Sequence, residues 1–496
     1  MNQELPKQAR AVIIGGGVVG CSVAYHLAKL GWSDIVLLER KRLTSGTTWH
    51  AAGLLPHLRA TLNMTKLAQY SGKLYANLEA ETGLSTGYRQ TGSIGVALSE
   101  HRFTEFKRQA SMAKVFGIEA HILSAAECKA AYPLLNSEGV VGGIWTPQDA
   151  QGDPSNIAHA LAKGARNAGA RIVEGVAVTG ITRARGRVTG VTTDSGDIAA
   201  DVVVNCAGLW GRDVGLMAGV NVPLQACEHF YVLTEAIGGL ARNLPVLRVP
   251  DECAYYKEDA GKMLIGFFEP LAKPWAVDGI PADFEFGTLP DDWDHIMPDL
   301  EKALARLPIL AEHGIHTFFN GPESFTPDDR YLIGEAPNLN GFFIAAGFNS
   351  VGIQSAGGAG KVLSEWIVNG SPPMDLHDVD IRRMFPFQNA KTYLVARAKE
   401  SLGLLYADHF PFRQYETARG IRHTPFHDQL AANGAVFAEA AGWERPGWFL
   451  PADAKARGEK PEYHYNWGRQ NRFEHSAGEH LAIRKTVGVL DMSPFA

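Results

Sequence analysis

The stretch Ala11-Val12-Ile13-Ile14-Gly15-Gly16-Gly17-Val18-Val19-Gly20 decides the fold of the first part of this chain. Residues 11–14 are apolar and long enough for a buried strand, and the glycines that follow have the spacing G-x-G-x-x-G. Residues 21–30 show helical periodicity, and residues 35–38 form a second apolar run that ends at Glu39. This order predicts a strand, a glycine turn, a helix and a second strand.

Each part of this unit suits a bound dinucleotide. The first glycine, Gly15, permits the tight turn, and Gly17 lets the backbone approach a pyrophosphate. Gly20 lets the helix pack closely on the strand, so that the helix N-terminus faces the anion. Glu39 lies where an acidic side chain accepts hydrogen bonds from a ribose hydroxyl. The unit therefore predicts a dinucleotide site, although by itself it does not distinguish NAD from FAD.

The loop after Glu39 favours FAD. An NAD-dependent enzyme is expected to continue with alternating strands and helices. Here the chain enters a loop of small residues instead, Thr44-Ser45-Gly46-Thr47-Thr48-Trp49-His50-Ala51-Ala52-Gly53. Such a loop can lie along an extended FAD and reach its isoalloxazine ring, so we predict FAD as the cofactor.

The segment from Leu43 to Leu54 resembles the flavin-attachment segment of the dimethylglycine/sarcosine dehydrogenase family. The resemblance covers nearly the whole chain and implies that His50 carries FAD covalently through the flavin 8α-methyl group. That bond needs a neutral imidazole as the nucleophile, and much of a histidine population is neutral near physiological pH. Without the surrounding motif, His50 would be interpreted as an ordinary loop histidine.

Composition narrows the class of protein. The 496 residues carry a net charge of −6, which argues against a nucleic-acid-binding protein. The five cysteines include no C-x-x-C pair, a usage typical of a reducing compartment. No apolar run reaches membrane-spanning length, and the first ten residues lack the features of a targeting segment. We expect a cytoplasmic protein, or one of the mitochondrial matrix if it is a processed eukaryotic form, without membrane or nucleic-acid partners.

The remaining pattern predicts an α/β protein of several domains. A Rossmann-type FAD-binding domain is expected to be interleaved with an α+β substrate domain built on an antiparallel sheet, because residues 223–326 alternate in the manner of strands. The expected FAD-binding parts are residues 1–95, 150–222 and 322–385, and the expected substrate-domain parts are residues 96–149 and 223–321. A small connecting domain is predicted at 386–442.

The resemblance also implies that residues 443–496 begin a glycine-cleavage T-protein-like, folate-binding domain. The chain stops at Ala496, so this domain is expected to be incomplete. Tetrahydrofolate is accordingly a ligand only if the rest of the domain exists.

Later glycine-rich turns are expected to return to the cofactor. Ala207-Gly208 follows one apolar strand, and Gly347-Phe348-Asn349 follows another and precedes a helix of small residues. That helix N-terminus would face the flavin pyrimidine end, where negative charge develops on reduction. A second glycine-rich packing helix is the alternative. The predicted cofactor-binding residues are Gly15, Gly17, Val18, Val19, Gly20, Glu39, Arg40, Ser45, Thr47, Thr48, His50, Ala51, Val176, Ala207, Gly208, Trp210, Gly347, Phe348, Asn349, Gly352 and Ile353.

His229 and Tyr256 are the predicted catalytic residues, because their surroundings resemble the family's active-site strands. They are expected to orient the substrate and tune the proton of its amine. Tyr255 and Tyr256 fall on opposite strand faces, and Tyr256 is chosen because the resemblance places it at the position of the family tyrosine. On periodicity alone, His229 would be an ordinary strand histidine. Arg59 is a candidate for holding a substrate carboxylate, but a surface position is the commoner one for a lone arginine, so it stays outside the predicted set.

Other chemistries find no support in the sequence. The H-E-x-x-H pattern is absent, and Pro425 interrupts the segment between His423 and His427, so no metal site is predicted. The string Gly83-Leu84-Ser85-Thr86-Gly87 has the G-x-S-x-G spacing, but it follows a predicted helix where a nucleophile elbow requires a strand.

The leading hypothesis is oxidative demethylation of a small N-methyl amino acid, dimethylglycine or sarcosine, by hydride transfer from the N-methyl carbon to flavin N5. The resulting iminium would yield formaldehyde or methylene-tetrahydrofolate, and the final electron acceptor would be oxygen or an electron-transfer flavoprotein. One alternative is a longer substrate such as 4-methylaminobutanoate. Another is a non-catalytic flavoprotein similar to the pyruvate dehydrogenase phosphatase regulatory subunit.

Overall fold

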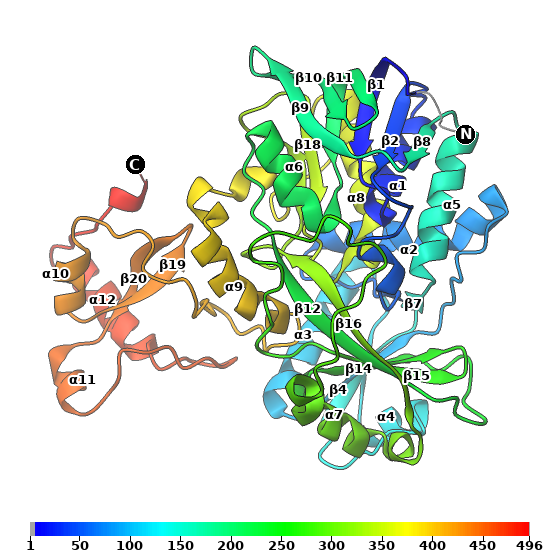
Figure 1. Ribbon diagram of the computed structural model, residues 1–496. Helices are drawn as coiled ribbons and strands as arrows, with labels where there is room; N and C mark the ends of the chain where they lie inside the picture. Colours follow the sequence, from blue (N-terminus) through cyan, green and yellow to red (C-terminus); the bar gives the residue numbers. More distant parts are fainter. Residues whose placement is uncertain (1–4, 496) are drawn as a thin grey trace. The chain divides into compact units, whose positions relative to one another are not determined.

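The computed structural model describes residues 5–495 (Figure 1). The chain divides into two compact units, of which the first ends at Ala407 and the second begins at Asp408. The division falls inside the stretch expected to be a connecting domain. No helix in the described residues is long and apolar enough to cross a lipid bilayer.

The first sheet of the larger unit is the predicted nucleotide-binding sheet. Its strand order is β17-β18-β11-β1-β2-β8, and all neighbours are parallel except β17 and β18. The antiparallel strands β9 and β10 extend it beside β11. The bounds are β1 Gln8–Ile14, β2 Ile35–Glu39, β8 Arg171–Glu174, β9 Val178–Ala184, β10 Arg187–Thr193, β11 Gly196–Asn205, β17 Leu332–Glu335 and β18 Phe342–Ala346.

Both faces of this sheet are covered, which is why its central strands are apolar throughout. Ala11 and Ile13 of β1 belong to the core cluster that contains the helices α1 (Val18–Lys29), α2 (Leu62–Thr82), α5 (Pro154–Asn167) and α8 (Gly352–Asn369). Val12 and Ile14 point to the other face, into the cluster formed with β9, β10 and α6 (Gly211–Ala218). The period of two along β1 therefore divides the core into two layers.

The second sheet has the order β16-β12-β15-β14-β13-β4-β6-β5. The predicted antiparallel sheet is confirmed from β12 to β16, whereas β13 and β4 run parallel. Many residues separate β4 from β13 in the chain, so the two strands can run either parallel or antiparallel. A tight hairpin would allow only the antiparallel direction. The bounds are β4 Ser93–Ala97, β5 His121–Leu123, β6 Gly142–Thr146, β12 Gln225–Thr234, β13 Val246–Val249, β14 Ala254–Asp259, β15 Lys262–Phe267 and β16 Ile315–Phe325. The helices α3 (Glu100–Phe116), α4 (Ala125–Ala131) and α7 (Trp293–Arg306) accompany it.

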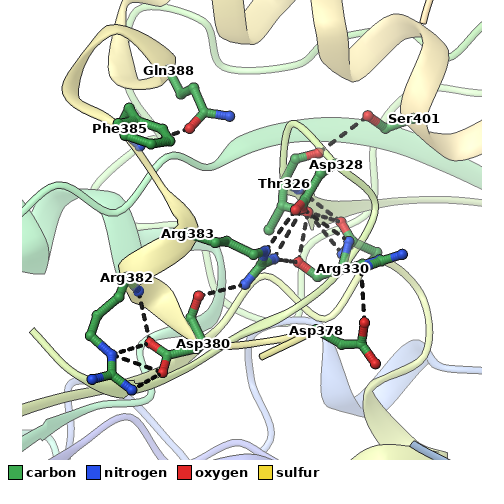
Figure 2. A network of polar contacts seen from close by, with 11 residues as sticks. Thr326, Asp328, Arg330, Asp378, Asp380, Arg382, Arg383, Phe385, Gln388 and Ser401 are labelled. Carbon is green, nitrogen blue, oxygen red and sulfur yellow. Dashed lines mark hydrogen bonds and ion pairs between the residues drawn. The ribbon is translucent and has the colours of Figure 1, made fainter. Parts of the chain in front are cut away.

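A polar network fixes the loop between β16 and β17 (Figure 2). Arg383 donates from two nitrogens to the Asp328 carboxylate, at 2.6 and 3.0 Å, and also to the Arg330 carbonyl oxygen. Ser401 of α9 (Lys391–Leu404) donates to the carbonyl oxygen of Thr326 at 3.2 Å. Because the network holds the backbone at Thr326, it also supports the residues that Thr326 contacts near the site described below.

The smaller unit has its own compact core. Its two-stranded antiparallel sheet, β19 (Ala435–Ala440) and β20 (Trp443–Phe449), is accompanied by α10 (His427–Ala432), α11 (Ala452–Ala456) and α12 (Phe473–Lys485). The buried residues of this core are Val436, Trp448, Leu450 and Ala454.

Close packing of α8 on α2 requires a glycine at position 358. A Cβ atom added there would lie 2.3 Å from the Leu67 carbonyl oxygen, and that backbone cannot move aside as a flexible side chain could. We therefore expect Gly358→Ala to lower the free energy of unfolding by about 1–3 kcal/mol. Calorimetric melting measures the change. The control is Gly478→Ala in α12, where an added Cβ meets nothing within 4 Å and alanine favours the helix. A Gly358→Ala protein that melts like the wild type would contradict the packing argument.

Candidate functional site: two cavities that meet at Glu323

A cavity of about 330 Å³ lies at the carboxyl ends of β1, β2, β11 and β18. This is where open α/β sheets bind nucleotides. Of the predicted cofactor-binding residues, all but Gly20, His50 and Ala51 line it. Ala51 lines neither this cavity nor the second one described below, because it packs against the helical core cluster.

The glycine turn shapes this cavity by close backbone contact. Gly15 has a φ of +109°, and a Cβ atom there would lie 2.4 Å from the Cys206 carbonyl oxygen. A Cβ atom at Gly20 would lie 2.0 Å from the Gly15 carbonyl oxygen, so Gly20 acts through packing and does not line the cavity. At the start of α1, the Val18 N–H donates to the Thr48 hydroxyl at 3.0 Å. The loop of residues 44–53 is thereby fixed against the helix N-terminus.

Glu39 faces the same cavity from the end of β2. Its carboxylate accepts hydrogen bonds from the backbone N–H groups of Gly16, at 2.7 Å, and Lys41, at 2.9 Å. Burial raises the pKa of Glu39, and these two bonds oppose that rise. A carboxylate oxygen has more than one lone pair, so capacity remains for ribose hydroxyl groups. The glycine cradle and this acid fit the adenosine end of a dinucleotide.

Other lining residues of this cavity are also suited to a polar ligand. Arg40 stacks over the Trp210 ring at 3.9 Å, and the buried Trp210 Nε1–H has no hydrogen-bond partner among the described residues. Asn349 has a φ of +46°, and its side-chain oxygen accepts from the Thr326 N–H at 2.8 Å. The network of Figure 2 therefore continues to the loop before α8.

A second cavity, of about 140 Å³, meets the first. Glu323, Ser350 and Ile353 line both cavities and so mark the junction. Five aromatic side chains contribute to the rest of the wall of the second cavity: Tyr231, Tyr255, Phe268, Phe319 and Tyr406.

The predicted flavin-attachment residue, His50, lines this second cavity beside the junction. It is buried, and its Nε2 has no hydrogen-bond partner in the part of the chain that the structure describes. Burial, reinforced by the neighbouring His229, lowers the pKa of His50 to about 3. The ring is therefore neutral at physiological pH. Gly321 makes room for it, because a Cβ atom there would lie 2.9 Å from the His50 ring.

The structure brings His229 to the same cavity but not Tyr256. His229 and Tyr231 of β12 share a sheet face, and Tyr231 pairs with Gly266, which pairs in turn with Tyr255. A Cβ atom at Gly266 would lie 2.0 Å from the Tyr255 ring, so this glycine makes space for the tyrosine. Tyr256 points to the other face, into the core cluster under that sheet. Tyr256, predicted as a catalytic residue, therefore does not line the second cavity, whereas its neighbour Tyr255 does, because strand register decides which face each side chain takes.

Two arginines face the second cavity. Arg59, set aside in the sequence analysis, lines it together with Arg248 of β13. Arg248 lies 3.8 Å from Asp149, whereas Arg59 forms no ion pair with any described residue. Burial lowers the pKa of Arg59, and the like charge of Arg248 adds to that effect. The sequence contained no signal for Arg248, Ser350 or Glu323, because their convergence depends on which strands pair.

Comparison with known proteins assigns the class. The model of the family described as FAD dependent oxidoreductase matches residues 10–366, and that of the FAD dependent oxidoreductase central domain matches residues 369–424. The GCVT N-terminal domain model matches residues 426–496. The fold resembles that of L-proline dehydrogenase from P. horikoshii, with a TM-score of 0.67, 26% identity, and coverage of 75% of this chain and 96% of that one. Glycine oxidase from Geobacillus kaustophilus shares the fold at 24% identity, with a TM-score of 0.66 and coverage of 77% of this chain and 100% of that one.

The chain belongs to the FAD-dependent oxidoreductases, and its resemblance to the dimethylglycine/sarcosine dehydrogenase family is confirmed. It is 43% identical to 4-methylaminobutanoate oxidase (formaldehyde-forming) from Paenarthrobacter nicotinovorans, over 99% of this chain and 59% of that protein. It is 43% identical to human mitochondrial sarcosine dehydrogenase, over 98% of this chain and 53% of that protein. It is 40% identical to the mitochondrial pyruvate dehydrogenase phosphatase regulatory subunit of mouse, over 99% of this chain and 56% of that protein. The chain thus spans between 53% and 59% of the length of these relatives.

Glu39 offers a test of the first cavity. We expect Glu39→Ala, made in a chain that also carries His50→Ala, to weaken the affinity for added FAD about tenfold, because a charge-assisted hydrogen bond contributes roughly 1.5–3 kcal/mol. Titration of the flavin-free protein with FAD measures the dissociation constant. Glu79→Ala, an exposed position on α2, serves as the control in the same His50→Ala background. An unchanged dissociation constant in the Glu39→Ala chain would show that this acid does not hold the cofactor.

Proposed function

We propose that this chain binds FAD in the first cavity and demethylates a small N-methyl amino acid in the second. When bound, FAD supplies a two-electron acceptor for the N-methyl carbon. The net products would be formaldehyde and the demethylated amine. The observation that carries the proposal is the pair of adjoining cavities. The buried carboxylate of Glu323 lines both, and the second is lined in addition by neutral histidines, two arginines and five aromatic side chains.

We propose in addition that His50 bonds covalently to the flavin. A nucleophilic imidazole must be uncharged and must present a free ring nitrogen. Burial keeps the His50 ring uncharged. Its Nε2 is free, because it has no hydrogen-bond partner among residues 5–495. His50 also lies beside the place where the two cavities join, which is where the ring end of a cofactor extending from the glycine cradle would arrive.

The second cavity suits an amino acid through two kinds of lining group. Arg59 and Arg248 carry like charges that repel each other, and an anionic group would relieve this repulsion. His229 presents a neutral ring, because burial lowers its pKa to about 4. Tyr255, Phe268 and the neighbouring aromatic rings limit water, which favours the neutral form of a bound amine.

Dimethylglycine and sarcosine are the leading substrates in this proposal. The relative named 4-methylaminobutanoate oxidase supports a longer substrate as the second candidate. A third candidate is a non-catalytic flavoprotein, supported by the relative named as a phosphatase regulatory subunit. The ratio of kcat/KM values for sarcosine, dimethylglycine and 4-methylaminobutanoate separates the first two. Failure of all three to reduce the bound flavin without oxygen would favour the third.

Three further features of the reaction are part of the proposal: a folate role, the electron acceptor and the cellular location. The match of the GCVT N-terminal domain model supports a folate role, provided that the remainder of such a domain accompanies this chain. Oxygen or an electron-transfer flavoprotein would accept the electrons. A cytoplasmic or a mitochondrial matrix location agrees with the absence of a C-x-x-C pair among the five cysteines.

The covalent link is tested by acid precipitation. We expect the yellow colour to stay with the wild-type pellet and to be released from His50→Ala, since alanine offers no nucleophile. Visible absorbance of pellet and supernatant measures the distribution. His57→Ala is the control, because this second buried histidine lies outside both cavities. Release of colour from the wild type would rule out the bond while leaving FAD binding intact.

The carboxylate site is tested at Arg59. We expect Arg59→Gln to raise KM for the amino acid substrate about 10- to 100-fold, the loss expected for one hydrogen bond to a charged group. Steady-state kinetics measure KM and kcat separately. The matched control is Arg484→Gln, an exposed arginine in α12. An unchanged KM in Arg59→Gln would mean that the substrate carboxylate binds elsewhere.

A further inference from the structure

Glu323 is an acidic side chain that faces both cavities. It lies near the end of β16 and is 6% exposed. Ser350 stands next to it, and a hydrogen bond between the two side chains favours the charged carboxylate. The Ser350 hydroxyl also lies 3.4 Å from His229 Nε2. Glu323, Ser350 and His229 thus form a connected set of polar groups across the junction.

The position of Glu323 follows from strand register. Cys227 of β12 is its partner across the sheet, and His229 pairs with Gly321, two residues earlier on β16. Residues two apart on a strand share a face, so Glu323 and His229 point to the same side. That side is the cavity side, because His229 and Tyr231 both line the second cavity.

The other ionisable groups of this region do not neutralise Glu323. It forms no ion pair with any residue in the described range 5–495. The ionisable groups that pair with it across the sheet or line the second cavity are Cys227, His229 and Tyr231 on β12, Tyr255 on β14, Arg248 on β13, Arg59 and His50 in the amino-terminal loops, and Tyr406 after α9. Those that line the first cavity are Glu39, Arg40, Cys206 and Asp213. Burial raises the pKa of Glu323 to about 7, so the carboxylate and the acid are both accessible near neutral pH.

The proposed reaction needs a proton acceptor at this place. An alkylammonium group has a pKa of about 10, so an N-methyl amino acid arrives protonated at neutral pH. Its nitrogen lone pair must be free before the N-methyl carbon can be oxidised. Burial lowers the pKa values of His50 and His229 to about 3 and about 4, which makes both weak bases. Burial shifts the pKa of Tyr255 in the opposite direction, well above its usual range, so its hydroxyl stays protonated.

We propose that Glu323 accepts the ammonium proton of the bound substrate, while Ser350, which also contacts His229, holds the Glu323 carboxylate in position. The proton moves from the substrate nitrogen to one Glu323 carboxylate oxygen. The ammonium becomes a neutral amine and the carboxylate becomes a carboxylic acid, without any transfer of electrons. This inference rests on the proposed demethylation, and it assigns that reaction a base that acts before the oxidation.

The proposal predicts a specific pH profile. Only the deprotonated carboxylate can accept the proton, so kcat/KM of the wild type should rise with pH through about 7 and then level off. In Glu323→Gln the levelling of kcat/KM above pH 7 should disappear. The variant should depend on substrate that is already neutral, so its kcat/KM should be about 100-fold lower than that of the wild type at pH 7. It should keep rising with pH toward the pKa of the amine, at about 10. Stopped-flow reduction of the bound flavin across this pH range measures both profiles.

Matched variants separate the base from its surroundings. Glu235→Gln, at an exposed glutamate beyond the end of β12, should keep the wild-type profile. Ser350→Ala should move the rise to higher pH without removing it, because Ser350 stabilises the charged form of Glu323. A Glu323→Gln profile that still rises and levels off near pH 7 would overturn the proposal. If the wild type oxidises none of the N-methyl amino acids tried, the proposed function fails instead.

A second measurement does not depend on turnover. Infrared difference spectra of the flavin-containing protein between pH 5 and pH 9, roughly two units either side of the pKa, should contain the carbonyl stretch of the Glu323 carboxylic acid beside those of other buried carboxyl groups such as Glu39. The Glu323 band should be missing in Glu323→Gln and present in Glu235→Gln. A wild-type difference spectrum equal to that of Glu323→Gln would overturn the proposal even if the variant were poorly active.

Discussion

The contact between three backbone segments at Gly15 and Gly20 is the constraint on which the rest of the structure depends. The Cys206 carbonyl oxygen and the Gly15 carbonyl oxygen occupy the places where Cβ atoms would stand. Only glycine permits that approach, and without it β1, α1 and the end of β11 could not converge. Their convergence opens the first cavity and fixes the direction in which the following loop leaves. His50 reaches the second cavity because that loop is held against the N-terminus of α1 through Thr48.

The second sheet imposes a different constraint: successive side chains along each strand point to opposite faces of the sheet. One face is packed on its own core, with Phe230 and Tyr256 fully buried. The other face presents His229, Tyr255 and Glu323 to the space beside the nucleotide-binding sheet. Glycines at positions 266 and 321 leave room for large rings opposite them. A polar site can lie on a sheet whose other face is apolar because successive side chains alternate.

Burial gives the ionisable groups at the junction their chemical character. Removal from water disfavours every charged form, so it keeps His50 and His229 neutral while it brings the pKa of Glu323 to about 7. The same low-dielectric wall leaves Arg59 charged without an ion-pair partner among the described residues. In the proposed function, a substrate with one carboxylate and one amine would supply charge that complements Arg59 and Glu323. Selectivity would then depend on the positions of these groups rather than on the overall charge of the chain.

The sequence by itself determined the nucleotide-binding unit, because its signals are local. Strand, glycine turn, helix and acid follow one another within residues 11–39, and their spacing is a direct consequence of how a backbone approaches a pyrophosphate. The antiparallel character of residues 223–326 was likewise visible in the alternation of apolar residues. Only the tertiary structure decided which residues share the second cavity. Tyr255 rather than Tyr256 faces it, and Arg248, Ser350 and Glu323 meet there, because pairing register and sheet packing join segments that lie far apart in the chain. Alternation along a strand separates two faces but does not say which face meets the cavity, since that depends on the strands and layers on either side.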